Sequence, residues 1–76
     1  MYVTLTPNVR EAMAADPVMA FAIEYLRRDA RRGFLHLSRS RRDGPFCAEF
    51  YAPGGNTKRQ AESPVLADAI LRAVEP

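Results

Sequence analysis

The sequence has little of what disulfide bonding, zinc binding or membrane insertion requires. Its 76 residues contain one cysteine and one histidine, which excludes an internal disulfide and a zinc finger. No apolar run approaches the ~18 residues of a membrane span, and the first four residues have neither a basic start nor the apolar core of a signal peptide. We therefore expect a cytoplasmic protein with no membrane partner, no metal and no cofactor.

The composition is that of one small folded domain. Hydrophobic residues make up 47% of the chain and charged residues 26%, which is ordinary for a globular protein and argues against disorder. A chain this short buries only about 60% of the surface that its unfolded form exposes. Its stability therefore depends on good helix caps, a partner or a second copy. We expect residues 1–76 to form a single domain.

Three pairs of a capping residue and a proline predict three helix starts. Thr6-Pro7, Asp16-Pro17 and Ser63-Pro64 each place a side-chain oxygen before a residue that loses nothing at the first helical position by lacking an N–H. The residue before a proline is pushed out of the α region, so the segments on either side of Asp16 cannot form one straight helix. The main helix is expected over 17–32, and another over 64–75.

Apolar residues at helical spacing indicate which face of these two helices packs on the core. Over 17–32 the stripe comprises Val18, Phe21, Ala22, Tyr25 and Leu26, widened by Met19, Ile23 and Ala30. Over 64–75 it comprises Val65, Leu66, Ala69, Ile70, Ala73 and Val74. Gly33 is expected to cap the C-terminus of the first helix.

A β-hairpin is predicted between the two helices, because the apolar-rich runs 34–39 and 46–52 flank the strong turn dipeptide Asp43-Gly44. A four-residue loop over 41–44 sets one register, and a tight two-residue turn is the alternative, which keeps the same side chains on the same faces. With the longer loop the core face pairs Leu35 with Phe50, Leu37 with Ala48 and Arg39 with Phe46. The mixed face pairs Phe34 with Tyr51, His36 with Glu49 and Ser38 with Cys47.

These elements predict an α+β fold, in which a small antiparallel sheet packs with two main helices. A hairpin alone is marginal in water. The alternating segment Tyr2–Thr6 could add a third strand before Pro7 ends it. Residues 53–62 are expected to form an exposed, mobile loop.

The stretch from Val18 to Val74 resembles the small phage ABA-sandwich family, whose members have a helix–hairpin–helix arrangement. The resemblance rests on Leu26-Arg27-Arg28, Gly33-Phe34-Leu35-His36-Leu37, Phe46-Cys47-Ala48-Glu49-Phe50 and the segment from Ala61 to Val74. It implies a phage protein acting in the bacterial host cytoplasm and supplies no catalytic residues. By size and setting it implies an accessory protein that inhibits a bacterial defence system, in the manner of anti-CRISPR proteins.

Basic residues are concentrated between residues 27 and 43. Seven arginines stand there against two aspartates, a local charge of +5, whereas the rest of the chain carries −3. Arginine binds phosphates and acidic protein surfaces, but a solvated face whose helical part complements the macrodipole is the alternative. The predicted partner-binding residues are Arg27, Arg28, Arg31, Arg32, Arg39, Arg41 and Arg42.

Three other patterns point to chemistry less strongly. His36, Cys47 and Glu49 share a sheet face, as a Cys–His nucleophile would require, but the chain offers no glycine-rich oxyanion loop beside them. The segment 54–58 lacks the spacing of a phosphate-binding P-loop. The element order resembles an RNA-recognition fold without its last strand, although Pro45 and Cys47 stand where stacking aromatics belong.

We therefore expect binding rather than catalysis. The expected function is that of a non-enzymatic accessory protein, which binds a host protein or ribonucleoprotein complex stoichiometrically and inhibits it. The alternative is a basic nucleic-acid-binding module that uses the arginine-rich helix end and hairpin. A homodimer that associates through the mixed sheet face is a third hypothesis.

Overall fold

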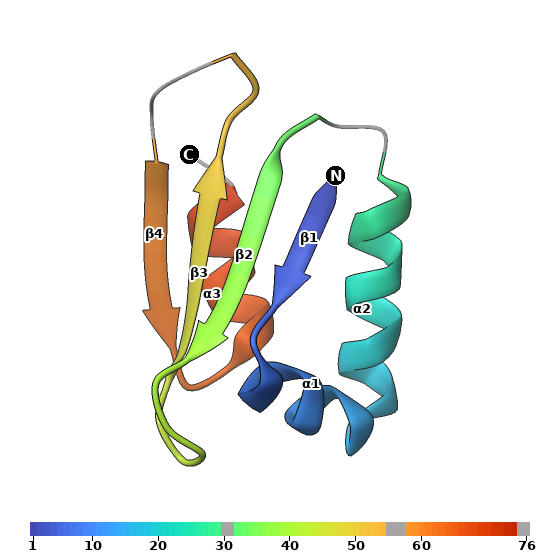
Figure 1. Ribbon diagram of the computed structural model, residues 1–76, viewed down its shortest axis with the longest axis vertical. Helices are drawn as coiled ribbons and strands as arrows, with labels where there is room; N and C mark the ends of the chain where they lie inside the picture. Colours follow the sequence, from blue (N-terminus) through green and yellow to red (C-terminus); the bar gives the residue numbers. More distant parts are fainter. Residues whose placement is uncertain (30–31, 55–57, 75–76) are drawn as a thin grey trace.

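A four-stranded sheet is covered by helices on one face (Figure 1). The computed structural model describes residues 1–29, 32–54 and 58–74. Within these ranges the predicted α+β fold class is confirmed, and the sheet is larger than expected. The elements are β1 (Tyr2–Leu5), α1 (Pro7–Ala14), α2 (Pro17–Arg28), β2 (Phe34–Arg39), β3 (Phe46–Tyr51), β4 (Lys58–Ser63) and α3 (Leu66–Val74).

The strands lie in the order β1-β2-β3-β4. All six predicted cross-strand pairs of β2 and β3 are confirmed, from Phe34 opposite Tyr51 to Arg39 opposite Phe46. The Gly44 N–H donates to the Arg41 carbonyl at 3.0 Å, which closes the four-residue turn. The predicted third strand is also present as β1, but it runs parallel to β2. The sheet is therefore mixed, because α1 and α2 carry the chain back before β2 begins.

The predicted loop over residues 53–62 is wrong where β4 forms. Lys58–Ser63 pairs antiparallel with β3 along its whole length, with Ala48 opposite Ala61 and Phe46 opposite Ser63. This strand is polar because it lies at the sheet edge, where charged side chains protect against further strand pairing. Its sequence therefore lacks the apolar alternation that marks a half-buried strand. The rest of the predicted loop includes residues 55–57, which lie outside the described ranges.

Two of the predicted helix starts are confirmed in place, at Pro7 and Pro17, whereas α3 begins two residues later than predicted, and the three caps differ. Asp16 Oδ1 accepts hydrogen bonds from the N–H groups of Val18 and Met19 at 3.0 and 3.3 Å. Ser63 Oγ accepts from the Val65 N–H at 3.2 Å, although α3 itself begins at Leu66. Thr6 occupies the N-cap position of α1 without a capping hydrogen bond from its side chain.

The predicted end of the main helix is wrong. Helix α2 ends at Arg28, and its C-cap is Asp29 in an extended conformation rather than Gly33. The N-terminal ammonium of Met1 donates to the Asp29 carbonyl at 2.7 Å, which supports an early end of the helix. Gly33 is required for another reason. Its φ of +145° disfavours other residues, and a Cβ there would lie 2.8 Å from the Phe50 ring.

The core lies between the helices and one face of the sheet. The face predicted to be buried is confirmed, since Leu35, Leu37 and Phe46 are buried and Phe50 packs against them half-buried. Most of the predicted α3 stripe is buried too, although Val74 is only partly buried and Val65 is exposed. The buried hydrophobic residues of the described ranges are Val3, Leu5, Val9, Ile23, Leu35, Leu37, Phe46, Ala48, Leu66, Ala69, Ile70 and Ala73.

The predicted core stripe of α2 is wrong in its main members. Ile23 is fully buried, and Met19 and Leu26 pack beside it, whereas Phe21 and Tyr25 are exposed. Helix α2 has apolar residues on two adjoining faces, at spacings that both suit a helix. Periodicity alone cannot decide which face turns toward the sheet. The result is an outer apolar stripe that the fold leaves uncovered.

We expect Leu66→Ala to destabilise the protein by about 2–5 kcal/mol, because it removes buried methyl groups and leaves a cavity. Leu71→Ala is the matched control, since it makes the same change on the same helix at a side chain that is 54% exposed. Its effect should stay near 0.5 kcal/mol. Thermal unfolding of dilute protein, followed by circular dichroism, measures both. Equal shifts in the two midpoints would contradict the placement of Leu66 in the core.

Candidate functional site

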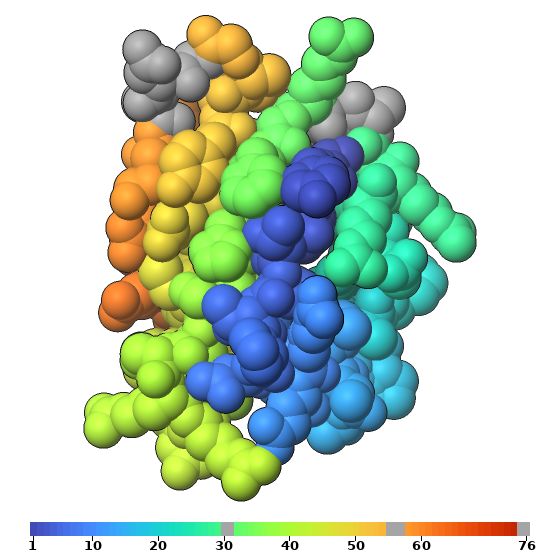
Figure 2. All heavy atoms as spheres, viewed as in Figure 1, coloured from blue at the N-terminus to red at the C-terminus, as the bar shows by residue number. Residues whose placement is uncertain are grey.

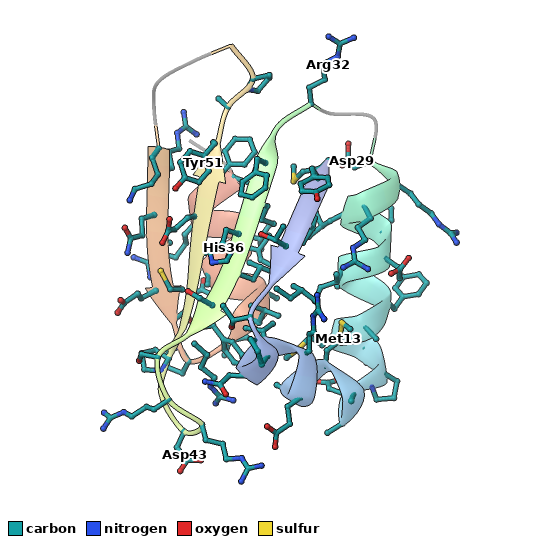
Figure 3. All side chains as sticks on the ribbon, in the orientation of Figure 1. Met13, Asp29, Arg32, His36, Asp43 and Tyr51 are labelled. Carbon is teal, nitrogen blue, oxygen red and sulfur yellow. The ribbon has the colours of Figure 1, made fainter. Side chains whose placement is uncertain are left out.

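The structure does not bring the predicted arginines together on one surface. Arg27 and Arg28 end α2, and Arg32 lies near them before β2, whereas Arg41 and Arg42 lie in the β2–β3 turn. In Figure 3 Arg32 and Asp43 mark these two places at opposite ends of the molecule, whose longest dimension is 33 Å. Arg31 lies outside the described residues. The described arginines of the predicted set therefore lie at two separate places.

Several arginines have partners within the chain. Arg27 forms an ion pair with Glu24 at 2.9 Å. Arg42 pairs with Glu11 of α1, and that hydrogen bond raises the pKa of Arg42. Arg39 stabilises the β2–β3 turn, because its Nε donates to the Gly44 carbonyl at 2.8 Å and its guanidinium lies 4.3 Å from the centre of the Phe46 ring.

Exposed ion pairs of this kind contribute only about 0–1 kcal/mol. They leave Arg27 and Arg42 able to exchange an internal partner for an external one. Arg39 differs, since its contacts build the hairpin turn. If Arg39 bound a partner, as predicted, that binding would therefore compete with these structural contacts.

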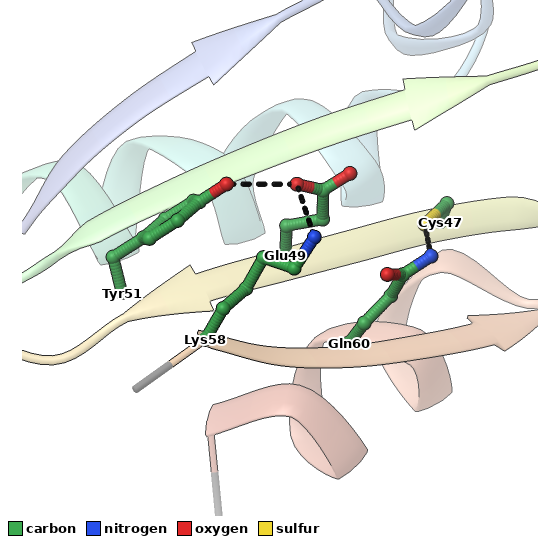
Figure 4. Close-up of polar contacts among 5 residues, drawn as sticks. All are labelled: Cys47, Glu49, Tyr51, Lys58 and Gln60. Carbon is green, nitrogen blue, oxygen red and sulfur yellow. Dashed lines mark hydrogen bonds and ion pairs between the residues drawn. The ribbon is translucent and has the colours of Figure 1, made fainter. Parts of the chain in front are cut away.

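The side chains proposed for a Cys–His pair have other partners. His36 Nδ1 lies 2.8 Å from the Thr4 hydroxyl, and the Cys47 Sγ accepts from Gln60 at 3.3 Å (Figure 4). Each contact crosses to a neighbouring strand and satisfies polar atoms on the sheet surface. Within the described residues, no group of three or more His, Cys, Asp or Glu side chains could hold a metal ion.

Glu49 is the centre of a second polar group on the same face. Its carboxylate accepts from the Tyr51 hydroxyl at 3.0 Å and lies 3.8 Å from the Lys58 ammonium (Figure 4). The hydrogen bond to the carboxylate raises the pKa of Tyr51, because an ionised phenol would lose the bond and face a like charge. Tyr51 is thereby held as a neutral donor against the sheet.

The face that carries these groups is the one seen in Figure 2, and it is open because the helices cover the opposite side of the sheet (Figure 1). A row of aromatic residues crosses it, because Tyr2, Phe34 and Tyr51 lie directly opposite one another on β1, β2 and β3. Neighbouring ring centroids are 5.5 and 5.7 Å apart. The pairing of Phe34 with Tyr51 on this face was predicted from the sequence, and Tyr2 joins them because β1 pairs in parallel with β2.

An exposed apolar surface lies on the helical side of the molecule. Five large apolar side chains of the helical layer are exposed, and their exposed fractions are 77% for Val18, 74% for Phe21, 65% for Tyr25, 60% for Val65 and 54% for Leu71. Single exposed apolar residues are ordinary, but a contiguous patch of several hundred Å² marks an interaction site. This surface is therefore the strongest candidate for binding.

These side chains border a groove between α2 and α3, which we call the α2–α3 groove. Its volume is about 400 Å³. A smaller hollow of about 210 Å³ continues it past Val18 and Val65. The groove is lined by Phe21, Ala22, Tyr25 and Leu26 of α2 and by Ala67, Ile70 and Leu71 of α3.

The α2 residues of the groove were predicted from the sequence to form an apolar stripe, but that stripe was assigned to the core. The signal that could have corrected this is the presence of two apolar stripes on one helix, Met19–Ile23–Leu26 and Val18–Phe21–Tyr25. A helix on a single sheet can bury only one such stripe. The other is then available to a partner.

No protein-family model, curated protein sequence or solved structure shows significant similarity to the chain. The resemblance to the phage ABA-sandwich family therefore stays a prediction. Of the helices in the described ranges, none has the length and apolar composition needed to cross a membrane.

We expect any binding of a DNA duplex to depend only weakly on salt, because each end of the molecule presents few arginines. Contact through Arg41 and Arg42 should give a log–log salt slope of about −2. Fluorescence anisotropy of a labelled duplex between low and moderate salt measures it. A slope of about −5 would contradict this placement if the affinity fell equally with Arg41→Glu/Arg42→Glu and with Arg27→Glu/Arg28→Glu. That result would show that the two arginine groups act on one ligand.

Proposed function

We propose that the chain is a non-enzymatic protein-binding module whose docking surface is the α2–α3 groove. The observation that supports this most directly is the exposure of Val18, Phe21 and Tyr25 on α2 beside Leu71 on α3 and Val65, which directly precedes α3. Two aromatic side chains lie among them, and aromatic residues dominate the energetic centres of protein interfaces. A groove between two helices also suits an amphipathic helix of a partner.

The magnitude of the apolar surface fits this role. The five exposed side chains present roughly 600 Å², given that a fully buried aromatic side chain covers about 150–250 Å². Removing that area from water would contribute ~15 kcal/mol before the costs of association, which are themselves about 4–15 kcal/mol. A surface of this size therefore supports binding, with an affinity that depends on the fit of the partner.

A nucleic-acid ligand suits this groove poorly. Phosphates need cations along their path, and the side chains that line the groove between α2 and α3 are apolar. The alternative of a basic nucleic-acid-binding module would use the two ends of the molecule instead.

Inhibition of a bacterial defence complex, as expected from the resemblance, is a more specific form of this proposal. A stoichiometric inhibitor needs an exposed surface that fits its target, and the α2–α3 groove offers one. Loss of inhibition on Phe21→Glu, in cells that carry such a complex and are challenged with phage, would support this form.

Site-specific photo-crosslinking tests the docking surface. We expect Tyr25→p-benzoylphenylalanine to give protein adducts after irradiation of cells that express the chain. The matched control is Tyr2→p-benzoylphenylalanine, because Tyr2 is as exposed as Tyr25, at 67% against 65%, and lies on the sheet face. Mass spectrometry identifies the adducts. Equal adducts from both positions, or none from position 25, would contradict the proposal.

A further inference from the structure

The outer stripe of α2 has the spacing of a helix that pairs with another helix. Val18, Phe21 and Tyr25 are followed on the same face by Arg28, so that the intervals are three, four and three residues. This is the alternation of the a and d positions of a heptad, whose side chains interdigitate with those of a facing helix. Three of the four are large apolar residues, and Arg28 can lay its aliphatic stem on the partner.

We propose that the α2–α3 groove is occupied by a second copy of this chain, which makes the protein a two-fold symmetric dimer with α2 packed antiparallel on α2. The inference rests on the proposed function, since it names the partner of the same surface. In such a pair Phe21 faces Tyr25 of the second copy, and Val18 faces the stem of Arg28. Leu71 of α3 and Val65, which directly precedes α3, close the two sides.

The charges beside the outer stripe of α2 are few and of both signs. The hollow next to Phe21 and Tyr25 is bordered by Glu24 and Arg28, and Glu24 already forms an ion pair with Arg27 of the same helix. A strongly acidic or basic partner would therefore gain little at this surface.

The size of the surface agrees with a dimer. A stable interface buries about 800 Å² on each partner, and the exposed apolar side chains of the groove supply roughly 600 Å² of that. The rim residues supply the remainder. A domain of this length also gains stability from a second copy, because its own core is small.

Sedimentation equilibrium and light scattering of the purified full chain test the inference, from about 1 μM to about 1 mM. We expect a reversible shift from the 8.5 kDa monomer to twice that mass. Phe21→Glu should raise the dimer dissociation constant by at least ~30-fold, as loss of an interface hot spot does. It should leave the circular dichroism spectrum unchanged, because the side chain is 74% exposed.

Tyr2→Glu is the matched control and should leave the dimer intact. A chain that stays monomeric throughout overturns the inference, and so does a dimer that only Tyr2→Glu disrupts, because that dimer would use the sheet face. If the chain is monomeric while Tyr25→p-benzoylphenylalanine still captures another protein, the inference fails and the proposed function stands. If that position also captures nothing, both fail.

Discussion

The packing of the helices against a single face of the sheet is the constraint on which the other features depend. Leu35 and Leu37 of β2 point into that face and are fully buried, and Ile23 of α2 and Leu66 of α3 enclose them from the other side. Only one stripe of α2 can take part in this layer. The second stripe, which includes Phe21 and Tyr25, must then face outward, so the apolar groove is a direct consequence of how the core closes.

The same constraint separates two surfaces of different chemistry. The helical side presents an apolar groove, which suits a protein partner. The open side of the sheet presents the aromatic row of Tyr2, Phe34 and Tyr51 beside the group centred on Glu49. The polar side chains there bond mainly to one another across strands. Association through the helical side would leave this sheet face accessible on both copies.

The local features of the fold could be predicted from the sequence, and the long-range ones could not. The register of β2 and β3 follows from side-chain alternation and the turn near Gly44, both local. Strand β4 was not predicted, because charged residues such as Lys58 and Arg59 give this edge strand the composition of a loop. The separation of the arginines was not predicted either, because Arg28 and Arg41 are close in sequence, whereas β2 places them at opposite ends of the molecule. Which stripe of α2 is buried depends on β1, which precedes it and pairs with β2.

Hydroxyl-radical footprinting tests most directly the claim that α2 exposes one apolar stripe and hides the other. In dilute solution the account predicts rapid oxidation of Phe21 and Tyr25 and very slow oxidation of Phe46, which is only 5% exposed. At high protein concentration Phe21 and Tyr25 should become protected while Tyr2 stays reactive. Phe21 as unreactive as Phe46 in dilute solution, or oxidised equally fast at every concentration, would contradict the account.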